Sequence, residues 1–127
     1  MKKVVSGLLA IVAFIHLIPL TGVLGAPRLQ TLYGVTVDEP NMLILMQHRA
    51  VLFGLLGAFL LWAAFRPALV PLALVAGFVS VLTFLGFTWA APAHNALIGR
   101  VVVADWLALA CLALAAALHF WPARSNI

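Results

Sequence analysis

The stretch NMLILMQHRAVLFGLLGAFLLWAAF, residues 41–65, decides the fold, because nearly all of it is apolar over a length that crosses a bilayer. About 20 apolar residues are enough for a helix to span the ~30 Å hydrocarbon layer. Gln47, His48 and Arg49 interrupt this stretch near its start. An arginine at the centre of a spanning helix costs roughly 2.5–3.5 kcal/mol on insertion scales, so Arg49 needs a favourable contact inside the protein.

The composition of the whole chain matches that stretch. Of its 127 residues, 66% are hydrophobic and only 8% are charged, whereas soluble domains carry about 25% charged residues. Four apolar stretches of spanning length occur, at about 4–24, 41–65, 70–90 and 101–121. They predict an all-α integral membrane bundle of four transmembrane helices, a single domain over residues 1–127. The first stretch follows MKK but is longer than a usual signal-peptide core, so we expect it to be retained.

The positive charges are dispersed over the chain. The net charge is +4, but no basic face exists, which argues against a nucleic-acid partner and favours contacts with lipid headgroups. Lys and Arg in short loops are enriched on the cytoplasmic side. With both termini cytoplasmic, that side holds Lys2, Lys3, Arg66 and Arg124, and the other side holds Arg28, Arg49 and Arg100. This distribution predicts a cytoplasmic N-terminus.

Several local signals refine the helices. Pro19 removes a backbone hydrogen bond, so we expect the first helix to kink just beyond His16. The segment RLQTLYG, residues 28–34, is expected to lie as a short interfacial helix with Tyr33 among the headgroups. The acidic side chains of DEP, residues 38–40, suit the start of the next helix.

Small residues recur at spacings of three and four on the last three predicted helices. Such stripes mark where membrane helices approach one another, because small side chains let backbones come close. The stripes consist of Ala50, Gly54 and Gly57; of Ala73, Gly77 and Ser80; and of Ala104, Ala108, Cys111 and Ala115. Asp105 borders the last stripe and is therefore expected to point into the bundle.

Three ionisable side chains are expected at similar depth, in the outer half of the membrane. They are Arg49, Asp105 and His16. Arg100 and Asp105 are five apart on one helix and do not face each other favourably, so we expect Asp105 to take its partner from another helix. Arg49 is the best candidate, with His48 or His16 nearby and Arg100 as the alternative partner. Such a pair either fixes helix register alone or belongs to an outward-facing cavity.

Other chemistries find less support. His16 and His48 at similar depth are compatible with axial ligation of a haem b, but the sequence holds no CxxCH and no second matched pair. Met42, Met46 and His48 lack a recognised metal-ligand spacing. No GxSxG, Walker, GxGxxG or HExxH motif is present. We therefore predict no metal, no cofactor and no assigned catalytic residue.

The stretches LYGVTVDEPNMLILMQHRAVLFGLLG and NALIGRVVVADW resemble an uncharacterised family of small bacterial four-helix inner-membrane proteins. The resemblance covers nearly the whole chain and implies a multi-pass protein of the bacterial inner membrane. Some relatives are labelled phosphopantetheine adenylyltransferase; that soluble enzyme needs an α/β nucleotide-binding fold and a Gly-His motif, which this sequence lacks. The layout is distantly similar to DoxX-like and sterol-isomerase-like membrane folds. The family pattern picks out Tyr33, Gly34, His48, Arg49, Gly54, Asn95, Ala104 and Asp105.

These observations predict a small membrane protein that binds a lipid-like or other apolar small molecule at an outward-facing polar cluster. The candidate ligand-binding residues are His16, His48, Arg49, His94, Asn95, Arg100 and Asp105. The alternative is an accessory subunit that docks through its Gly/Ala faces with itself or with a larger membrane complex. An enzyme that uses Asp105 and a histidine as acid and base remains open. A small multidrug exporter is disfavoured, because the first helix offers His16 in place of a glutamate.

Overall fold

The computed structural model describes residues 2–121, and over these residues the chain forms helices and short connections only. The elements are α1 (Lys2–Leu17), the 3₁₀ helix η1 (Ile18–Leu24), α2 (Ala26–Tyr33), α3 (Pro40–Ala64), the 3₁₀ helix η2 (Pro67–Leu69), α4 (Val70–Ala90) and α5 (Ala96–Phe120). Four helical stretches are long and apolar enough to cross a membrane: Lys2–Leu24, Pro40–Ala64, Pro67–Ala90 and Ala96–Phe120. The predicted all-α, four-span fold is confirmed.

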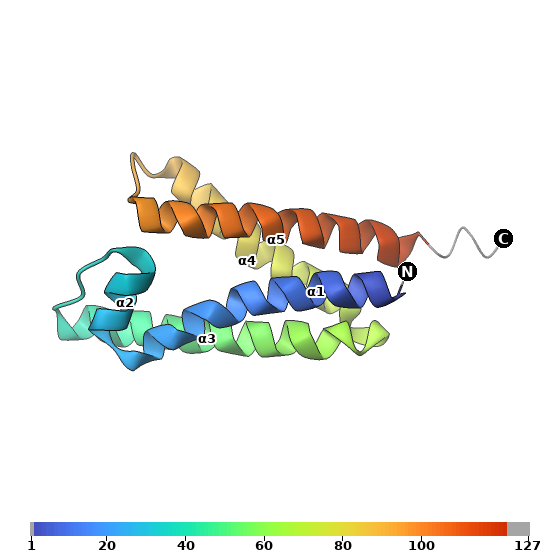
Figure 1. Ribbon diagram of the computed structural model, residues 1–127, viewed down its shortest axis with the longest axis horizontal. Coiled ribbons are helices and arrows are strands. Elements are labelled where there is room, and N and C mark those ends of the chain that lie inside the picture. Colours follow the sequence, from blue (N-terminus) through green and yellow to red (C-terminus); the bar gives the residue numbers. More distant parts are fainter. Residues whose placement is uncertain (1, 122–127) are drawn as a thin grey trace.

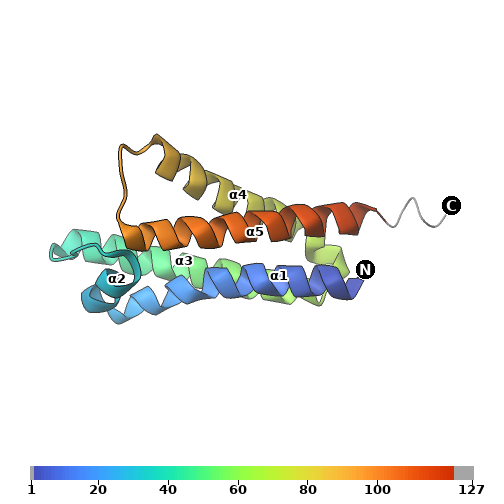
Figure 2. The same ribbon diagram turned by 45° about the horizontal axis from the view of Figure 1, so that its top comes forward.

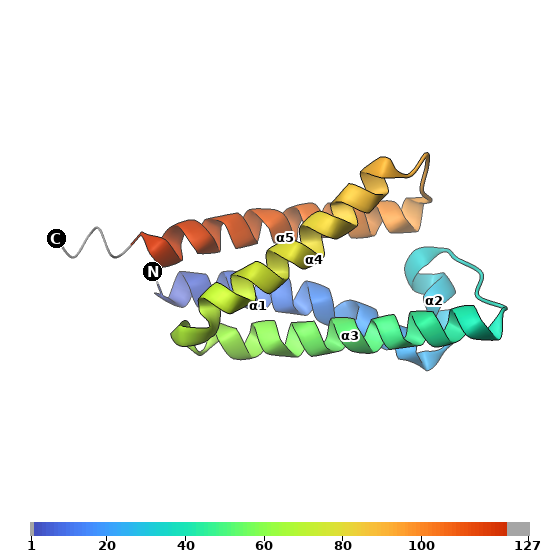
Figure 3. The same ribbon diagram turned by 180° about the vertical axis from the view of Figure 1, so that it is seen from behind.

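The helices pack around α1. In Figure 1, α1 lies between α3 and α5. Figure 3, the view from behind, shows α4 in front, crossing the bundle obliquely. Helix α4 diverges from α5 toward the end where α2 lies (Figure 2). That end, where α3 and α5 also begin, is called here the α2 end. Helix α1 begins and α5 ends at the opposite end (Figure 1), as an even number of spans requires.

Small residues let these helices approach closely. A Cβ added to Gly57 on α3 would lie 2.7 Å from Cγ of Leu17 and 3.1 Å from the Ala13 carbonyl oxygen. A Cβ on Gly77 of α4 would lie 2.8 Å from a methyl group of Leu112 on α5. The small-residue stripes therefore mediate contacts within the bundle, in the manner known for membrane helices.

The first span changes its helical form at the predicted position. Helix α1 ends at Leu17, and η1 continues it with Pro19 in its first turn. Proline lacks the N–H of a regular α-helical hydrogen bond, so the tighter 3₁₀ form replaces the α-helix just beyond His16. Gly25, at φ +124°, then turns the chain into α2.

Helix α5 begins at Ala96 rather than at residue 101, because Asn95 caps it. The Asn95 Oδ1 accepts a hydrogen bond from the Ile98 backbone N–H at 2.8 Å. Asparagine is among the best N-cap residues. The extra turn places Arg100 inside the helix and moves Asp105 further from its start. Helix α3 begins at Pro40, where the Glu39 side chain accepts from two backbone N–H groups; the last predicted anchor, Arg124, lies outside the described residues.

Candidate functional site

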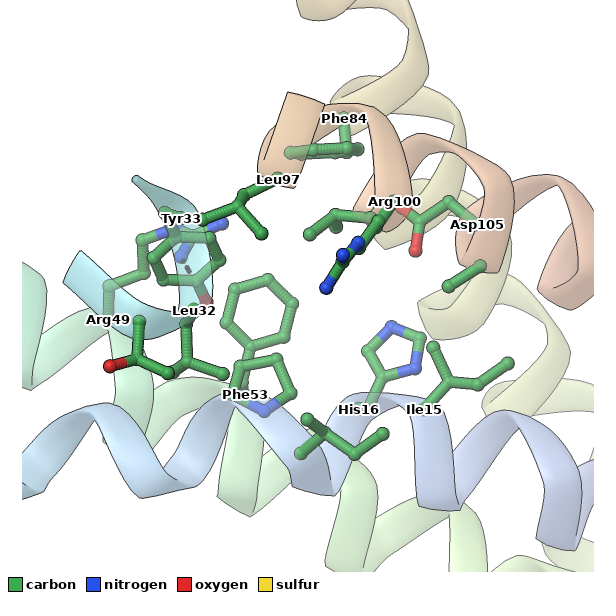
Figure 4. A pocket seen from close by; sticks show the side chains of 15 residues that line it. Ile15, His16, Leu32, Tyr33, Arg49, Phe53, Phe84, Leu97, Arg100 and Asp105 are labelled. Carbon is green, nitrogen blue, oxygen red and sulfur yellow. Dashed lines mark hydrogen bonds between the residues drawn. The ribbon is translucent and has the colours of Figure 1, made fainter. Parts of the chain in front are cut away.

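A cavity of about 290 Å³ lies at the α2 end of the bundle, between α1, η1, α2, α3 and α5, with Phe84 of α4 completing its wall. Figure 4 shows labelled side chains of α1, α2, α3, α4 and α5 around a common space. Most of the wall is aliphatic or aromatic, and the polar part consists of His16, Thr31, Tyr33, Arg49, Arg100 and Asp105. An apolar cavity with a few convergent polar groups is typical of a small-molecule site.

Arg49 is held by aromatic side chains. Its Nη1 donates a hydrogen bond to the Tyr33 hydroxyl oxygen at 3.2 Å. Its guanidinium carbon lies 4.5 Å from the centroid of the Phe53 ring and 5.3 Å from that of Tyr33. Aromatic faces attract a cation and can replace part of its hydration. These contacts explain how α3 accommodates an arginine.

The structure corrects the predicted partner of Arg49. Arg49 and Asp105 line the same cavity, but neither makes an ion pair with a residue in the range 2–121. In Figure 4, Arg49 and Tyr33 lie on one side of the cavity and Asp105 lies on the other. Tyr33 is also corrected: it is 7% exposed, and α2 places it against the bundle rather than among headgroups.

Asp105 makes no hydrogen bond and no ion pair in the described part of the chain, although the positive charge of Arg49 acts on it across the cavity. The residue is 8% exposed, and its carboxylate accepts no hydrogen bond from residues 2–121. No described side chain carries a fully enclosed oxygen without a partner, so the carboxylate retains accessible surface, and it faces the cavity (Figure 4). A buried carboxylate without a partner is costly. It is the strongest sign that the cavity receives another molecule.

Arg100 is the second guanidinium of the cavity. It is exposed, lines the cavity with Asp105, and points into it in Figure 4. Among the described residues it has no hydrogen-bond or ion-pair partner. The two arginines thus differ: Arg49 is engaged by aromatic residues, whereas Arg100 has all its donors available.

His16 lines the cavity from the end of α1 and is 2% exposed. Its Nδ1 lies 2.9 Å from the Val12 carbonyl oxygen, and its Nε2 lies 2.9 Å from Ser80 Oγ. Because a carbonyl only accepts, Nδ1 carries a hydrogen and donates it; in the neutral ring, Nε2 then accepts from the Ser80 hydroxyl. Both ring nitrogens are therefore used within the protein.

Four of the seven candidate residues meet at the cavity, namely His16, Arg49, Arg100 and Asp105. His48 is exposed on α3 and does not line the cavity, so it does not share a site with His16. His94 is exposed and lines a separate groove between α4 and α5. Among residues 2–121, no group of three His, Cys, Asp or Glu side chains is placed to hold a metal ion.

The third residue outside the cavity, Asn95, has a structural role. Besides capping α5, its Nδ2 donates to the Tyr33 carbonyl oxygen at 2.7 Å. This bond ties α2 to α5. Gly34, which follows α2, adopts a left-handed conformation at φ +67°, where glycine is favoured. Together Asn95 and Gly34 hold Tyr33 in place beside Arg49.

The sequence prediction missed the aromatic wall. Phe53 lies four residues after Arg49 on α3, so the two side chains share a helix face. That spacing was a readable signal for the cation–aromatic contact. The position of Tyr33 had no such local signal, because it depends on how α2 folds back over the bundle.

No protein-family model, curated protein or solved structure matches this chain.

Proposed function

We propose that this chain is a multi-pass inner-membrane protein that binds a lipid-like or other apolar small molecule in the cavity at the α2 end. The observation that carries the proposal is the Asp105 carboxylate, 8% exposed and without a hydrogen bond or ion pair among the described residues, at the edge of a mostly apolar cavity. Arg100, equally without a partner, adds donors beside it. A ligand with an apolar body and a polar end would satisfy both.

The proposed orientation follows from the charges at the two ends. Lys2 and Lys3 begin α1 and Arg66 lies in the connection between α3 and α4, against Arg28 and Arg100 near the α2 end. Lys2, Lys3 and Arg66 favour a cytoplasmic position for the end opposite α2. The cavity would then lie in the outer half of the membrane, and its ligand would enter from the outer leaflet.

Binding is favoured over the two alternatives. In an accessory subunit, the Gly/Ala stripes would face a partner protein, but Gly57 and Gly77 contact Leu17 and Leu112 of the same chain. In an enzyme, His16 would need a free ring nitrogen as acid or base, but both nitrogens are hydrogen-bonded within the protein. A binding site needs neither a small-residue face open to a partner protein nor a free histidine nitrogen.

Native mass spectrometry after gentle extraction tests the proposal. We expect the wild-type protein to retain an apolar adduct that Ala104→Phe loses, because Ala104 lines the cavity and a phenyl ring there would fill part of it. The matched control is Ala110→Phe, at an exposed position on the same helix. An adduct that Ala104→Phe retains in full, or a stoichiometric protein partner in its place, would contradict the proposal.

A further inference from the structure

The charges around the cavity do not balance. Arg49 and Arg100 each contribute a positive charge and Asp105 a negative one. With His16 in its neutral form, one positive charge remains in excess. This excess charge lies on Arg100, which is exposed and can therefore bind an anion at the mouth of the cavity. An occupant with a single negative charge would cancel it.

The negative group of such an occupant would bind at Arg100. The guanidinium of Arg49 is covered by Phe53 and Tyr33, and one of its N–H groups is donated to the Tyr33 hydroxyl. Arg100 points into the cavity (Figure 4) with no partner in the described chain. A guanidinium presents a planar fork of donors that matches a carboxylate or a phosphate.

Asp105 requires the complementary group, a hydrogen-bond donor. As a carboxylate it only accepts, and it would repel a second anion placed against it. Arg100 and Asp105 are five residues apart on α5, which corresponds to about 7.5 Å along the helix axis at ~1.5 Å per residue. The two side chains also leave the helix roughly 140° apart, but both reach the same cavity, so an occupant whose anion and hydroxyl group are a few bonds apart can contact Arg100 and Asp105 together.

The size of the cavity limits how much of the ligand's apolar chain it can enclose. Its volume of about 290 Å³ lies just below the roughly 300–1,000 Å³ that is typical of small-molecule sites. It suits a head group and the first part of one chain, not a whole two-chain phospholipid. Ile18, on the cavity wall, is 44% exposed, so the cavity reaches the surface there and a longer chain can continue into lipid.

We propose that the ligand is a single-chain amphiphile with one negative charge and a neighbouring hydroxyl group, whose anion binds Arg100 and whose hydroxyl donates to Asp105. This proposal rests on the proposed function and specifies its ligand class. A 3-hydroxy fatty acid has this chemistry: one carboxylate, one hydroxyl two carbons away, and one apolar chain.

Equilibrium binding of three labelled probes tests this proposal on the full chain in phosphatidylcholine nanodiscs. The probes are 3-hydroxydodecanoate, dodecanoate and 1-dodecanol, each measured against empty nanodiscs. We expect 3-hydroxydodecanoate to bind best. Arg100→Gln should weaken both acids by about tenfold or more, since charged hydrogen bonds are involved, and leave dodecanol unchanged. Asp105→Asn should bind dodecanoate more tightly and lose the preference for the hydroxy acid.

Matched controls are Arg66→Gln and Asp38→Asn, exposed residues away from the cavity, which should behave as wild type. If the three probes bind wild type equally and Arg100→Gln changes none of them, the head-group proposal is overturned while binding of an apolar ligand stands. Saturable binding of no probe would overturn the proposed function together with the head-group proposal. The ranking of the three probes on the wild-type protein tests the head-group proposal even if a variant fails to fold.

Discussion

Substituting Gly57 by alanine tests whether the bundle is packed as described. The added Cβ would lie 2.7 Å from Cγ of Leu17 and 3.1 Å from the backbone oxygen of Ala13. Real Cβ atoms do not approach a carbon at 2.7 Å, and Ala13, at 0% exposure, has no room to retreat. Forcing α1 away from α3 should cost about 1–3 kcal/mol, the usual range for overpacking.

The matched control is Gly86→Ala on α4, where an added Cβ meets nothing within 4 Å. Alanine is favoured over glycine inside a helix by roughly 0.5–1 kcal/mol, so this variant should be slightly more stable than wild type. The free energy of unfolding of both variants can be measured by SDS titration in mixed micelles. Equal stabilities, or a Gly57→Ala variant more stable than Gly86→Ala, would refute the close contact of α1 and α3.

Three further predictions concern the site. In double-mutant cycles measured by the free energy of unfolding, Arg49→Met with Tyr33→Phe should show a coupling of about 0.5–1.5 kcal/mol, as for one hydrogen bond. A larger coupling between Arg49→Met and Asp105→Asn would contradict this result and support a direct ion pair. Ser80→Ala should cost about 1–3 kcal/mol, because it leaves the buried histidine of α1 without one partner; an unchanged stability would contradict that bond. Asn95→Ala should cost roughly 0.5–2 kcal/mol and speed amide hydrogen exchange in the first turn of α5; unchanged exchange would mean the cap is unimportant.

The spans and their internal breaks could be predicted from the sequence because they depend on local properties. Hydropathy over some 20 residues locates a membrane helix, and Pro19 marks the end of α1 by its missing N–H group. The start of α5 was misplaced, because Gly99 and Arg100 look like loop residues beside an apolar run. The cap at Asn95 was the signal that outweighed them.

The site was predicted only in part, for a physical reason. Asp105 was expected inside the bundle because it borders a stripe of small residues, and His16 was expected at a similar depth; both line the cavity. The contacts of Arg49 depend on Tyr33, whose position is set by the left-handed Gly34 and by the hydrogen bond from Asn95. These are tertiary contacts between distant segments. A pairing rule based on charge alone selects Asp105 and overlooks an aromatic partner.

Photoaffinity labelling in native membrane vesicles tests the central claim most directly, the claim that the cavity at the α2 end binds an amphiphile. The probe is a fatty acid with a diazirine near its carboxyl group, and the labelled residues are mapped by mass spectrometry. The account predicts labelling concentrated within residues 97–105 of α5 and 49–53 of α3, and its loss when 3-hydroxydodecanoate competes. Labelling spread over exposed apolar positions such as Leu55 and Leu107, with no excess at the cavity and no competition, would contradict it.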